Sequence, residues 1–577
     1  MFRLSFAKRE IHTVFFLFVA ILSTITCQMN SRVVTPLGEM EGVEEIIRHE
    51  KVYQFRNIPY AQPPTGHLRL SKPIPFGSWS GVLNATKFGP SCMQPSYRNY
   101  VYDKYKPNLD MSEDCLSLNV YVARNISANA NRSVMVWIHG GSYLIGQGSL
   151  YDGSYLALTG DVVVVTLNYR LGPFGFTVSP TNGISGNYGL WDQRLALEWV
   201  QSNIASFGGN PNSVTIFGQS AGGFSVSLHA IIPDNKGLFH RVIAQSGSSE
   251  GPLAIWHSAA YTSEAMIRLL DCQNNTIKCI RSRSASEIVN YTRVLSSPLF
   301  LKDFFEIPSG PVVDHDFLYM DPTRLLMNKT SPNYRFFRSL DYMTGNVDTE
   351  GSISVDIIGL YAKLYGVLSN GISLTTFCEY YLPGLTTYYF GKVNDSISSD
   401  FLCSLYGSSG QTNQMNNAMN SYADANFIAP AVKSLIVHSK DNYLTNSFQF
   451  LFRRPCIDPA IRHKYDLWTN GSTHGSDNAY LFGLEDYQDR YNITVRSTDI
   501  SLSNTMMRYW TNFAKTGNPN SDDLPRWDAY DEVRQTYVNL DTSITQDQHL
   551  YQSRVDIWLK KLPDLIQHHL PDIVIGK

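Results

Sequence analysis

The chain has 577 residues, of which 43% are hydrophobic, so it is long enough to bury a large core. Its net charge of -3 provides no positive field that would attract a phosphate polymer, and no run of basic residues occurs in the mature part of the chain. Binding to nucleic acid is therefore excluded as its function.

The N-terminus has the pattern of a secretory signal. Basic residues precede an apolar run at 14–22, and small and polar residues follow up to Cys27. The alternative, an uncleaved anchor, is disfavoured because the run is shorter than the roughly 20 residues that span a bilayer. We expect residues 1–27 to be removed and residues 28–577 to form one domain, since no repeat or linker divides them. The ending at 573–577 has no retrieval signal or lipid-anchor tail, so the protein is expected to be secreted, extracellular and without a stable membrane anchor.

Acceptors for N-glycosylation support the secretory route, because the Asn-x-Ser/Thr pattern is used only there. Asn470 also matches, but a glycan four residues from His474 would obstruct the candidate site described below, so we leave it out. The remaining glycosylation candidates are Asn84, Asn125, Asn131, Asn274, Asn290, Asn328, Asn394 and Asn492.

The eight cysteines fit the same oxidising compartment. They form no Cys-x-x-Cys pair and have no clustered histidines, so disulfides are favoured and no metal or cofactor is expected. We expect Cys27 to leave with the signal and Cys456 to stay unpaired. The expected local pairs are Cys92–Cys115 and Cys272–Cys279. Cys378, Cys403 and Cys456 form an odd set whose pairing the residues leave open, and we choose Cys378–Cys403.

The mature chain begins with a predicted antiparallel edge and continues into buried strands. Apolar and polar residues alternate over 32–41 and 52–60, as in strands with one face exposed to solvent. Residues 134–138 and 162–167 are nearly all apolar, which favours central strands covered on both faces. Helical spacing at 189–205 completes a strand, helix, strand order, and its right-handed crossovers predict an α/β fold with a large, mostly parallel sheet.

Two later regions, about 256–304 and 353–421, are helical and irregular. Loop-rich helical insertions of this kind are typical of a cap, so we expect them to cover the carboxyl edge of the sheet, where α/β folds bind their ligands.

A serine framed by glycines follows a short β-branched run at 214–219. The order strand, Gly-x-Ser-x-Gly, helix, with helical spacing at 224–231, predicts a tight turn that holds Ser220 at its tip, beside a helix N-terminus. Such a turn suits a nucleophile, but the five-residue pattern is weak alone, since Gly and Ser are common in loops. Its interpretation depends on whether the chain also supplies a base, an acid and an oxyanion hole.

Backbone donors for a developing negative oxygen are predicted directly after the strand at 134–138. The glycines in His139-Gly140-Gly141-Ser142 would let backbone amides approach a ligand, although an ordinary glycine turn would have the same pattern. We assign the oxyanion hole to the N–H groups of Gly140, Gly141 and Ala221.

The base and the acid follow later in the chain. His474 lies in a flexible loop after the apolar segment 447–452, whereas His568 and His569 belong to a predicted surface helix. Asp348 and Glu350, in the turn after a short strand ending at Thr344, both have the chemistry of the acid. The residues alone leave that choice open.

Five segments carry a resemblance to a known family, and they are 55–64, 112–120, 168–176, 186–193 and 217–223. In this order they resemble the type-B carboxylesterase and cholinesterase family of α/β-hydrolases, across nearly all of residues 30 to 570. The resemblance implies that Glu350 is the acid and His474 the base, and that hydrolysis of a small ester passes through an acyl-enzyme on Ser220. It also implies the Cys92–Cys115 and Cys272–Cys279 disulfides.

The sequence departs from cholinesterases where those enzymes bind a quaternary ammonium on aromatic faces. By the same resemblance Tyr105 replaces a tryptophan, Gln219 replaces a glutamate, and the gorge positions Leu253, Ile353 and Ser354 carry no ring. We therefore favour a general carboxylesterase over a choline ester hydrolase. The remaining pocket positions, which indicate a medium apolar acyl group, are Phe305 and Ile307.

A non-catalytic adhesion protein of the same fold is the alternative from another class. The presence of Ser220, Glu350 and His474 disfavours it, because such relatives lose the serine. We expect a small-molecule ester as the binding partner, with a homodimer and a monomer both left open.

Overall fold

The computed structural model describes residues 30–95, 110–295, 309–355, 371–390, 395–409, 413–455, 457, 471–491 and 493–569. The expected signal at 1–27, Tyr105, Phe305, Ile307, Asn394, Cys456 and Asn492 lie outside these residues. Within the described ranges, no helix is long and apolar enough to cross a membrane.

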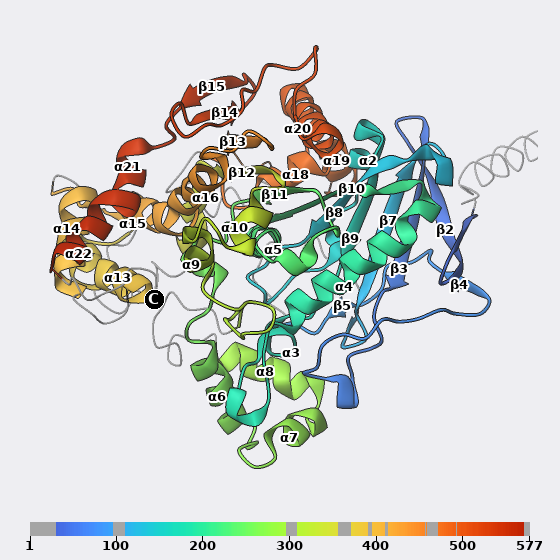
Figure 1. Cartoon of the computed structure of the whole chain (residues 1–577), viewed down its shortest axis with the longest axis horizontal. Helices are drawn as coiled ribbons and strands as arrows, with labels where there is room; N and C mark the ends of the chain where they lie inside the picture. Colours follow the sequence, from blue (N-terminus) through green and yellow to red (C-terminus); the bar gives the residue numbers. More distant parts are fainter. Residues whose placement is uncertain are drawn as a thin grey trace, which may run out of the picture.

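Thirteen of the described strands form one large sheet, and two more form a small pair (Figure 1). The strands of the large sheet are β1 (Asn30–Thr35), β2 (Gly38–Ile47), β3 (Glu50–Pro59), β4 (Val82–Asn84), β7 (Ser117–Ala123), β8 (Arg132–Ile138), β9 (Val163–Leu167), β10 (Gly209–Gln219), β11 (Arg241–Gln245), β12 (Asp341–Val347), β13 (Ser447–Phe452), β14 (Thr536–Leu540) and β15 (Thr545–Gln548). The small pair is β5 (Ser91–Cys92) with β6 (Met111–Ser112).

The strand order is β1-β2-β3-β7-β9-β8-β10-β11-β12-β13-β14-β15, with β4 beside β2. From β9 to β14 all neighbours run parallel. The neighbours from β1 to β9 and the pair β14–β15 run antiparallel. This is the predicted α/β-hydrolase architecture, a mixed and mostly parallel sheet that starts from an antiparallel edge.

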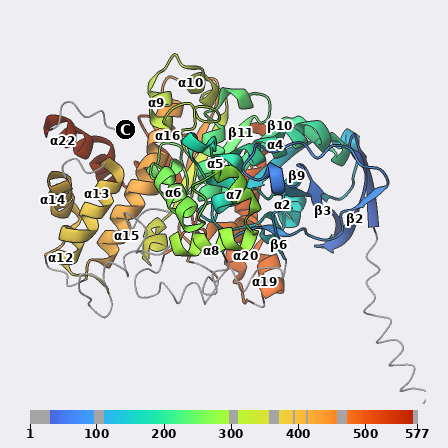
Figure 2. The ribbon, with the colours of Figure 1, turned by 90° about the horizontal axis from the view of Figure 1, so that it is seen from below.

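Helices surround the sheet, and some of them lie beyond its edges (Figure 1). They are α2 (Ser154–Gly160), α3 (Gly172–Phe176), α4 (Tyr188–Asn203), α5 (Ala221–His229), α6 (Ala259–Leu269), α7 (Thr276–Ser282), α8 (Ala285–Leu295), α9 (Pro322–Met327), α10 (Pro332–Phe337), α12 (Leu374–Thr376), α13 (Leu382–Phe390), α14 (Asp395–Tyr406), α15 (Met415–Ala423), α16 (Ala429–Ser439), α18 (Asp477–Leu481), α19 (Leu484–Tyr491), α20 (Ser497–Thr516), α21 (Gln552–Asp556) and α22 (Leu562–His569). Both views show α13, α14 and α22 gathered at one end of the molecule (Figures 1 and 2).

The central strands are buried on both faces because their alternate side chains enter two separate cores. Val134 and Val136 of β8 pack in one core with residues of α4 and α5, such as Leu197. Met135 and Trp137 pack in the other core with residues of α2 and α20. A strand with two apolar faces reads as a continuous apolar run, which is why these segments were recognisable in the sequence.

Most predicted boundaries differ from the observed ones by one or two residues, and two larger differences have a clear physical reason. The expected strand 32–41 is two strands, because Pro36 has no N–H for a ladder and the chain reverses between Thr35 and Gly38. The helix after Ser220 begins at once with Ala221, whereas helical spacing predicted it from Phe224. Because Gly222 and Gly223 have no side chains, the first residues of this helix show no apolar periodicity in the sequence.

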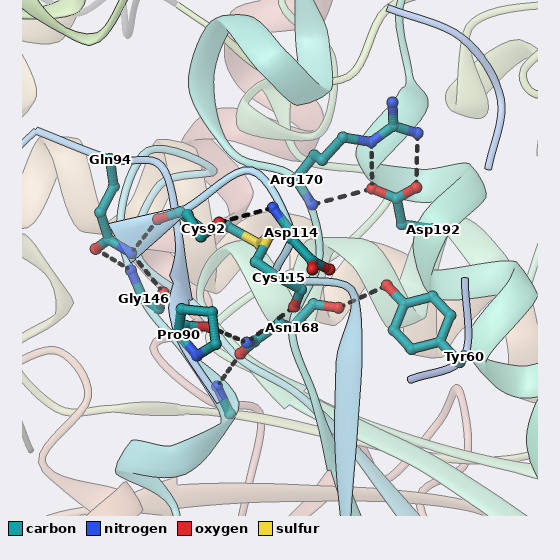
Figure 3. Close-up of a disulfide and its surroundings, with 12 residues drawn as sticks. Tyr60, Pro90, Cys92, Gln94, Asp114, Cys115, Gly146, Asn168, Arg170 and Asp192 are labelled. Atoms are coloured by element: carbon teal, nitrogen blue, oxygen red, sulfur yellow. Dashed lines mark hydrogen bonds and ion pairs between the residues drawn. A yellow bond between two sulfur atoms is a disulfide. The ribbon is translucent and has the colours of Figure 1, made fainter. Parts of the chain in front are cut away.

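A buried ion pair fixes one of the family-like segments to the next. Arg170 binds both carboxylate oxygens of Asp192, at 2.8 Å from Nε to Oδ2 and 2.7 Å from Nη2 to Oδ1 (Figure 3). The two side chains are 3% and 0% exposed, so neither charge has water as an alternative partner.

We predict that Asp192→Asn lowers the free energy of unfolding by about 3–5 kcal/mol, because the Arg170 guanidinium stays charged and buried without its counterion. The control Arg194→Ala breaks the half-exposed pair with Glu198 and should cost at most about 1 kcal/mol. Thermal melting followed by circular dichroism measures both variants. Equal melting temperatures for the two would show that the buried pair contributes no more than a surface pair.

Candidate functional site

Ser220 lies at the sharp turn between β10 and α5, as predicted. Its backbone has φ 58° and ψ -124°, a conformation that ordinary residues rarely adopt and that is found at functional sites. The Ser220 N–H donates to the Gln245 carbonyl at 2.9 Å, and the Ser220 carbonyl accepts from the Phe224 N–H at 2.8 Å. Gly222 must lack a side chain, because a Cβ there would be 1.9 Å from the Ile138 oxygen.

The predicted oxyanion glycines lie directly against this turn. A Cβ on Gly140 would be 3.1 Å from the Ser220 Cβ and 2.5 Å from the Gln219 oxygen. Gly141 has φ +109°, and a Cβ there would be 2.1 Å from the Ile145 oxygen. In the part of the chain that the structure describes, the N–H groups of Gly140 and Gly141 donate to no other backbone group. They are free to receive a ligand oxygen.

The structure pairs His474 with Glu350. His474 Nδ1 lies 2.5 Å from Glu350 Oε2, and Glu350 is completely buried. The other carboxylate oxygen accepts from the Val347 N–H at 2.9 Å and from the Asn346 Nδ2 at 3.1 Å. These bonds hold the carboxylate in one orientation toward the imidazole.

Asp348, the alternative acid, lies away from the imidazole and instead joins the two loops. Its Oδ1 accepts from the N–H and from the hydroxyl of Ser472, each at 2.8 Å. The Thr349 N–H donates to the Ser472 carbonyl at 3.1 Å. Burial raises the pKa of Asp348, although the bonds from Ser472 oppose this shift. The geometry therefore favours Glu350 as the partner of His474, whereas Asp348 links the loops that carry these two residues through hydrogen bonds.

Gln219 contacts the far nitrogen of the imidazole. Its Nε2 lies 3.2 Å from His474 Nε2, and its Oε1 accepts from the Asn478 Nδ2 at 3.3 Å. With the His474 proton on Nδ1, facing Glu350, Nε2 is an acceptor and the Gln219 amide donates to it. Among the described residues, no hydrogen bond joins the Ser220 hydroxyl to His474 in this state.

Phe427 is a site residue that sequence reasoning missed. Its ring centroid is 4.9 Å from that of His474, and the planes are tilted by 47°. It comes from a π-helical turn, η11 (Asp424–Ile428), that continues α15 into α16. Helical spacing shows that Phe427 is apolar and buried but cannot show which distant loop it faces, so the sequence carries no signal for this contact.

Of the remaining predicted pocket positions that are described, Leu253 lies in η8 (Pro252–Ala254), and Ile353 and Ser354 lie in η9 (Glu350–Ser354). Leu253 is buried, and η8 packs against both α5 and η11. Ile353 is 36% exposed, whereas Ser354 is buried and donates to the Gly351 carbonyl. Tyr105, Phe305 and Ile307 belong to the undescribed ranges.

The structure contains three disulfides among the described residues, and they are the three expected pairs, Cys92–Cys115, Cys272–Cys279 and Cys378–Cys403. The described glycosylation candidates all lie at exposed positions. These candidates are Asn84, Asn125, Asn131, Asn274, Asn290 and Asn328.

A second fully buried carboxyl group, that of Asp477, lies close enough to Glu350 and His474 to interact with their charges. Asp477 Oδ2 accepts from the Gln245 Nε2 at 2.7 Å, while Asp477 Oδ1 has no partner in the described structure. Burial raises the pKa of Asp477 to about 6, the Gln245 bond opposes this, and the charge of Glu350 adds to it. Its position three residues after His474, at the start of α18, is a signal that could have identified it in the sequence.

We predict that Asp477→Asn stabilises the protein more at pH 8 than at pH 4. The folded-state pKa of about 6 exceeds the ordinary 3.8, so the stability associated with the protonated group is intact below pH 3.8 and is lost as the pH rises through 6. Since asparagine avoids this loss, its advantage over the wild type should grow by roughly 2 kcal/mol between these pH values.

Melting temperatures of the variant and the wild type at pH 4 and pH 8 test this prediction. The opposite trend, in which the melting temperature of the variant falls relative to that of the wild type as the pH rises, would mean that the folded protein stabilises the Asp477 carboxylate. Asp522→Asn, at an exposed position, is the control for general pH effects.

Comparison with known proteins agrees with this geometry. The model of the carboxylesterase family matches residues 29–558. The chain is 34% identical to an acetylcholinesterase of Bungarus fasciatus, over 93% of this chain and 87% of the relative. It is 34% identical to a cholinesterase of Mus musculus, over 88% and 83%, and 31% identical to liver carboxylesterase 1F of Rattus norvegicus, over 91% and 92%. The chain thus belongs to the carboxylesterase family and is a carboxylic ester hydrolase.

Proposed function

We propose that this protein is a secreted serine esterase that hydrolyses neutral carboxylic esters through an acyl-enzyme on Ser220. The observation that carries the proposal is the bond between His474 Nδ1 and Glu350 Oε2, with the imidazole beside the turn that holds Ser220. A buried carboxylate at this nitrogen fixes the tautomer whose other nitrogen can accept a proton.

The first half of the proposed reaction acylates Ser220. His474 Nε2 takes the hydroxyl proton as the oxygen attacks the ester carbonyl, and the backbone N–H groups of Gly140, Gly141 and Ala221 bind the resulting oxyanion. The imidazolium then protonates the departing alcohol, and the ester C–O bond breaks. In the free protein the Gln219 amide occupies Nε2, so the Ser220 hydroxyl must replace that bond, as catalytic bonds in unliganded enzymes often form only with substrate.

The second half regenerates the enzyme. His474 Nε2 removes a proton from water, whose oxygen attacks the acyl carbon, and the oxyanion again binds the same amides. The bond to Ser220 then breaks, and the serine oxygen takes the proton from the imidazolium. No metal or cofactor takes part in these steps.

The preference for neutral esters rests on the charge beside the imidazole. Gln219 is neutral, and its amide is already oriented by Asn478 and His474. Leu253 provides an aliphatic side chain near the nucleophile helix, and an aliphatic surface gives a cation no π face. The relatives do not decide between the substrates, because their names include both cholinesterases and carboxylesterases at similar identity.

Secretion is supported by the disulfides and by the exposed glycosylation candidates. Three disulfides fit an oxidising compartment rather than the cytosol. Exposed asparagines in sequons leave room for a glycan on the folded protein.

Purified protein should release p-nitrophenol from p-nitrophenyl butyrate and take up one organophosphate label on Ser220, located by peptide mass spectrometry. Ser220→Ala should lose both properties. Folded wild-type protein that takes no label, or takes it stoichiometrically at another residue, would rule out the acyl-enzyme. Acetylthiocholine and an uncharged thioester of the same acyl group, compared in one thiol assay, test the substrate class. A higher kcat/KM for the charged substrate would overturn the preference for neutral esters.

We predict that Glu350→Gln lowers kcat by roughly 10³–10⁴, because an amide does not stabilise the imidazolium and can favour the wrong tautomer. Asp348→Asn should retain most of the activity, since an amide oxygen at the same position still accepts from Ser472. Steady-state kinetics, normalised to sites titrated with the organophosphate, measures both. The reverse order of the two losses would make Asp348 the acid.

A further inference from the structure

Two side chains form hydrogen bonds to the carbonyls of the peptide groups that carry the proposed oxyanion donors. The His139 carbonyl accepts from the Tyr169 hydroxyl at 2.9 Å, and both residues are completely buried. The Gly140 carbonyl is 2.8 Å from His139 Nδ1. A carbonyl oxygen only accepts, so this nitrogen carries the proton.

We propose that His139 and Tyr169 are positioning residues that aim the N–H groups of Gly140 and Gly141 at the substrate oxyanion. In a trans peptide the C=O and N–H bonds point in opposite directions. The His139 carbonyl and the Gly140 N–H belong to one peptide group, and the Gly140 carbonyl and the Gly141 N–H belong to the next. Each bond to a carbonyl therefore fixes the direction of one donor on the other side. This inference rests on the proposed function.

The two side chains also hold each other. Their rings are stacked, with centroids 4.4 Å apart and an angle of 22° between the planes. Burial lowers the pKa of His139 to about 4, so the ring is neutral and carries one proton at working pH. Its Nε2 has no partner among the described residues, which leaves the bond to the Gly140 carbonyl as the polar contact that sets the ring.

Gly146 packs against the bond between His139 Nδ1 and the Gly140 carbonyl. A Cβ there would be 2.3 Å from His139 Nδ1 and 2.6 Å from the Gly140 oxygen, so the backbone of Gly146 lies directly against this bond. The buried Gln94 binds both sides of Gly146, with Nε2 donating to its carbonyl at 2.9 Å and Oε1 accepting from its N–H at 3.0 Å (Figure 3). Gln94 is two residues from Cys92, so the Cys92–Cys115 disulfide loop braces the donors.

The next peptide group is held without a side chain. The Gly141 carbonyl accepts from the N–H groups of Leu144 and Ile145, each at 3.0 Å. The turn itself thus fixes this third group, whereas the first two depend on Tyr169 and His139. Substitution of those two side chains should disturb only the donors that they hold.

Tyr169→Phe keeps the stacked ring and removes the hydroxyl that binds the His139 carbonyl. We expect kcat for p-nitrophenyl butyrate to fall about tenfold per titrated site, less than the roughly 10²–10³ that follows complete loss of one donor. KM should change little. The inhibition constant of a trifluoromethyl ketone, whose adduct places an oxyanion in the hole, should rise by a similar factor.

Tyr509→Phe is the matched control, because its hydroxyl also donates to a backbone carbonyl, but to that of Pro525, which belongs to none of the loops that carry the proposed oxyanion donors. His139→Asn and His139→Leu form a second pair, since an asparagine Nδ2 can replace the ring donor and leucine cannot. We expect His139→Asn to retain much more kcat per site than His139→Leu.

The inference is overturned if Tyr169→Phe has the kcat and the inhibition constant of Tyr509→Phe, or if the two His139 variants are equally active per site. Failure of the proposed function would look different, because the wild type itself would then neither hydrolyse the ester nor take the label. Site titration separates a loss of folded protein from a loss of turnover, so a destabilised variant still gives an answer.

Discussion

Parallel pairing of the central strands is the constraint on which the site depends. Neighbouring parallel strands end at the same edge of the sheet, so the loops that leave them meet there regardless of their distance in sequence. Ile138 pairs with Gly218, Gln245 with Gly345, and Val347 with Phe452. The loops after β8, β10, β12 and β13 therefore deliver the glycines, Ser220, Glu350 and His474 to one place.

Three carboxyl groups, two of them fully buried and one partly exposed, have different surroundings and different roles at that edge. Glu350 is held by two donors and faces the imidazole, and Asp348 clips the two loops through Ser472. Asp477 has one donor and one oxygen without a partner in the described structure, and burial raises its pKa to about 6. A second ionised group so close to Glu350 would compete for the positive charge that forms on His474, and burial of Asp477 opposes that ionisation.

The donors of the proposed oxyanion hole depend on structure outside the catalytic loops. Tyr169 follows β9, and Gln94 belongs to the segment joined by the Cys92–Cys115 disulfide. Asn168, next to Tyr169, donates to the Pro90 and Cys115 carbonyls and accepts from the Gly148 N–H (Figure 3). The antiparallel side of the sheet and its disulfide thereby support the amides that would bind the oxyanion.

The sequence by itself determined the buried strands, the nucleophile turn and two local disulfide pairs, Cys92–Cys115 and Cys272–Cys279, whereas the structure decided the pairing among the remaining cysteines. The predicted segment 447–452 matches β13 residue for residue, because all six residues are buried and four of them are apolar; the other two are Ser447 and Gln449. The glycines around Ser220 predicted its turn because a backbone that close to Ile138 has no room for a Cβ.

Only the tertiary structure gives a physical reason for the choice between residues of equal chemistry, which the residues left open and the family resemblance implied. Asp348 and Glu350 are both carboxylates in one turn, and it is the backbone path of η9 that directs Glu350 to His474 and Asp348 to Ser472. The Phe427 ring over the imidazole and the hold of His139 on Gly140 also depend on the final packing. The first contact joins residues that are distant in the sequence, and the second depends on the orientation of one side chain. Neither produces a periodic pattern that could be recognised in the sequence.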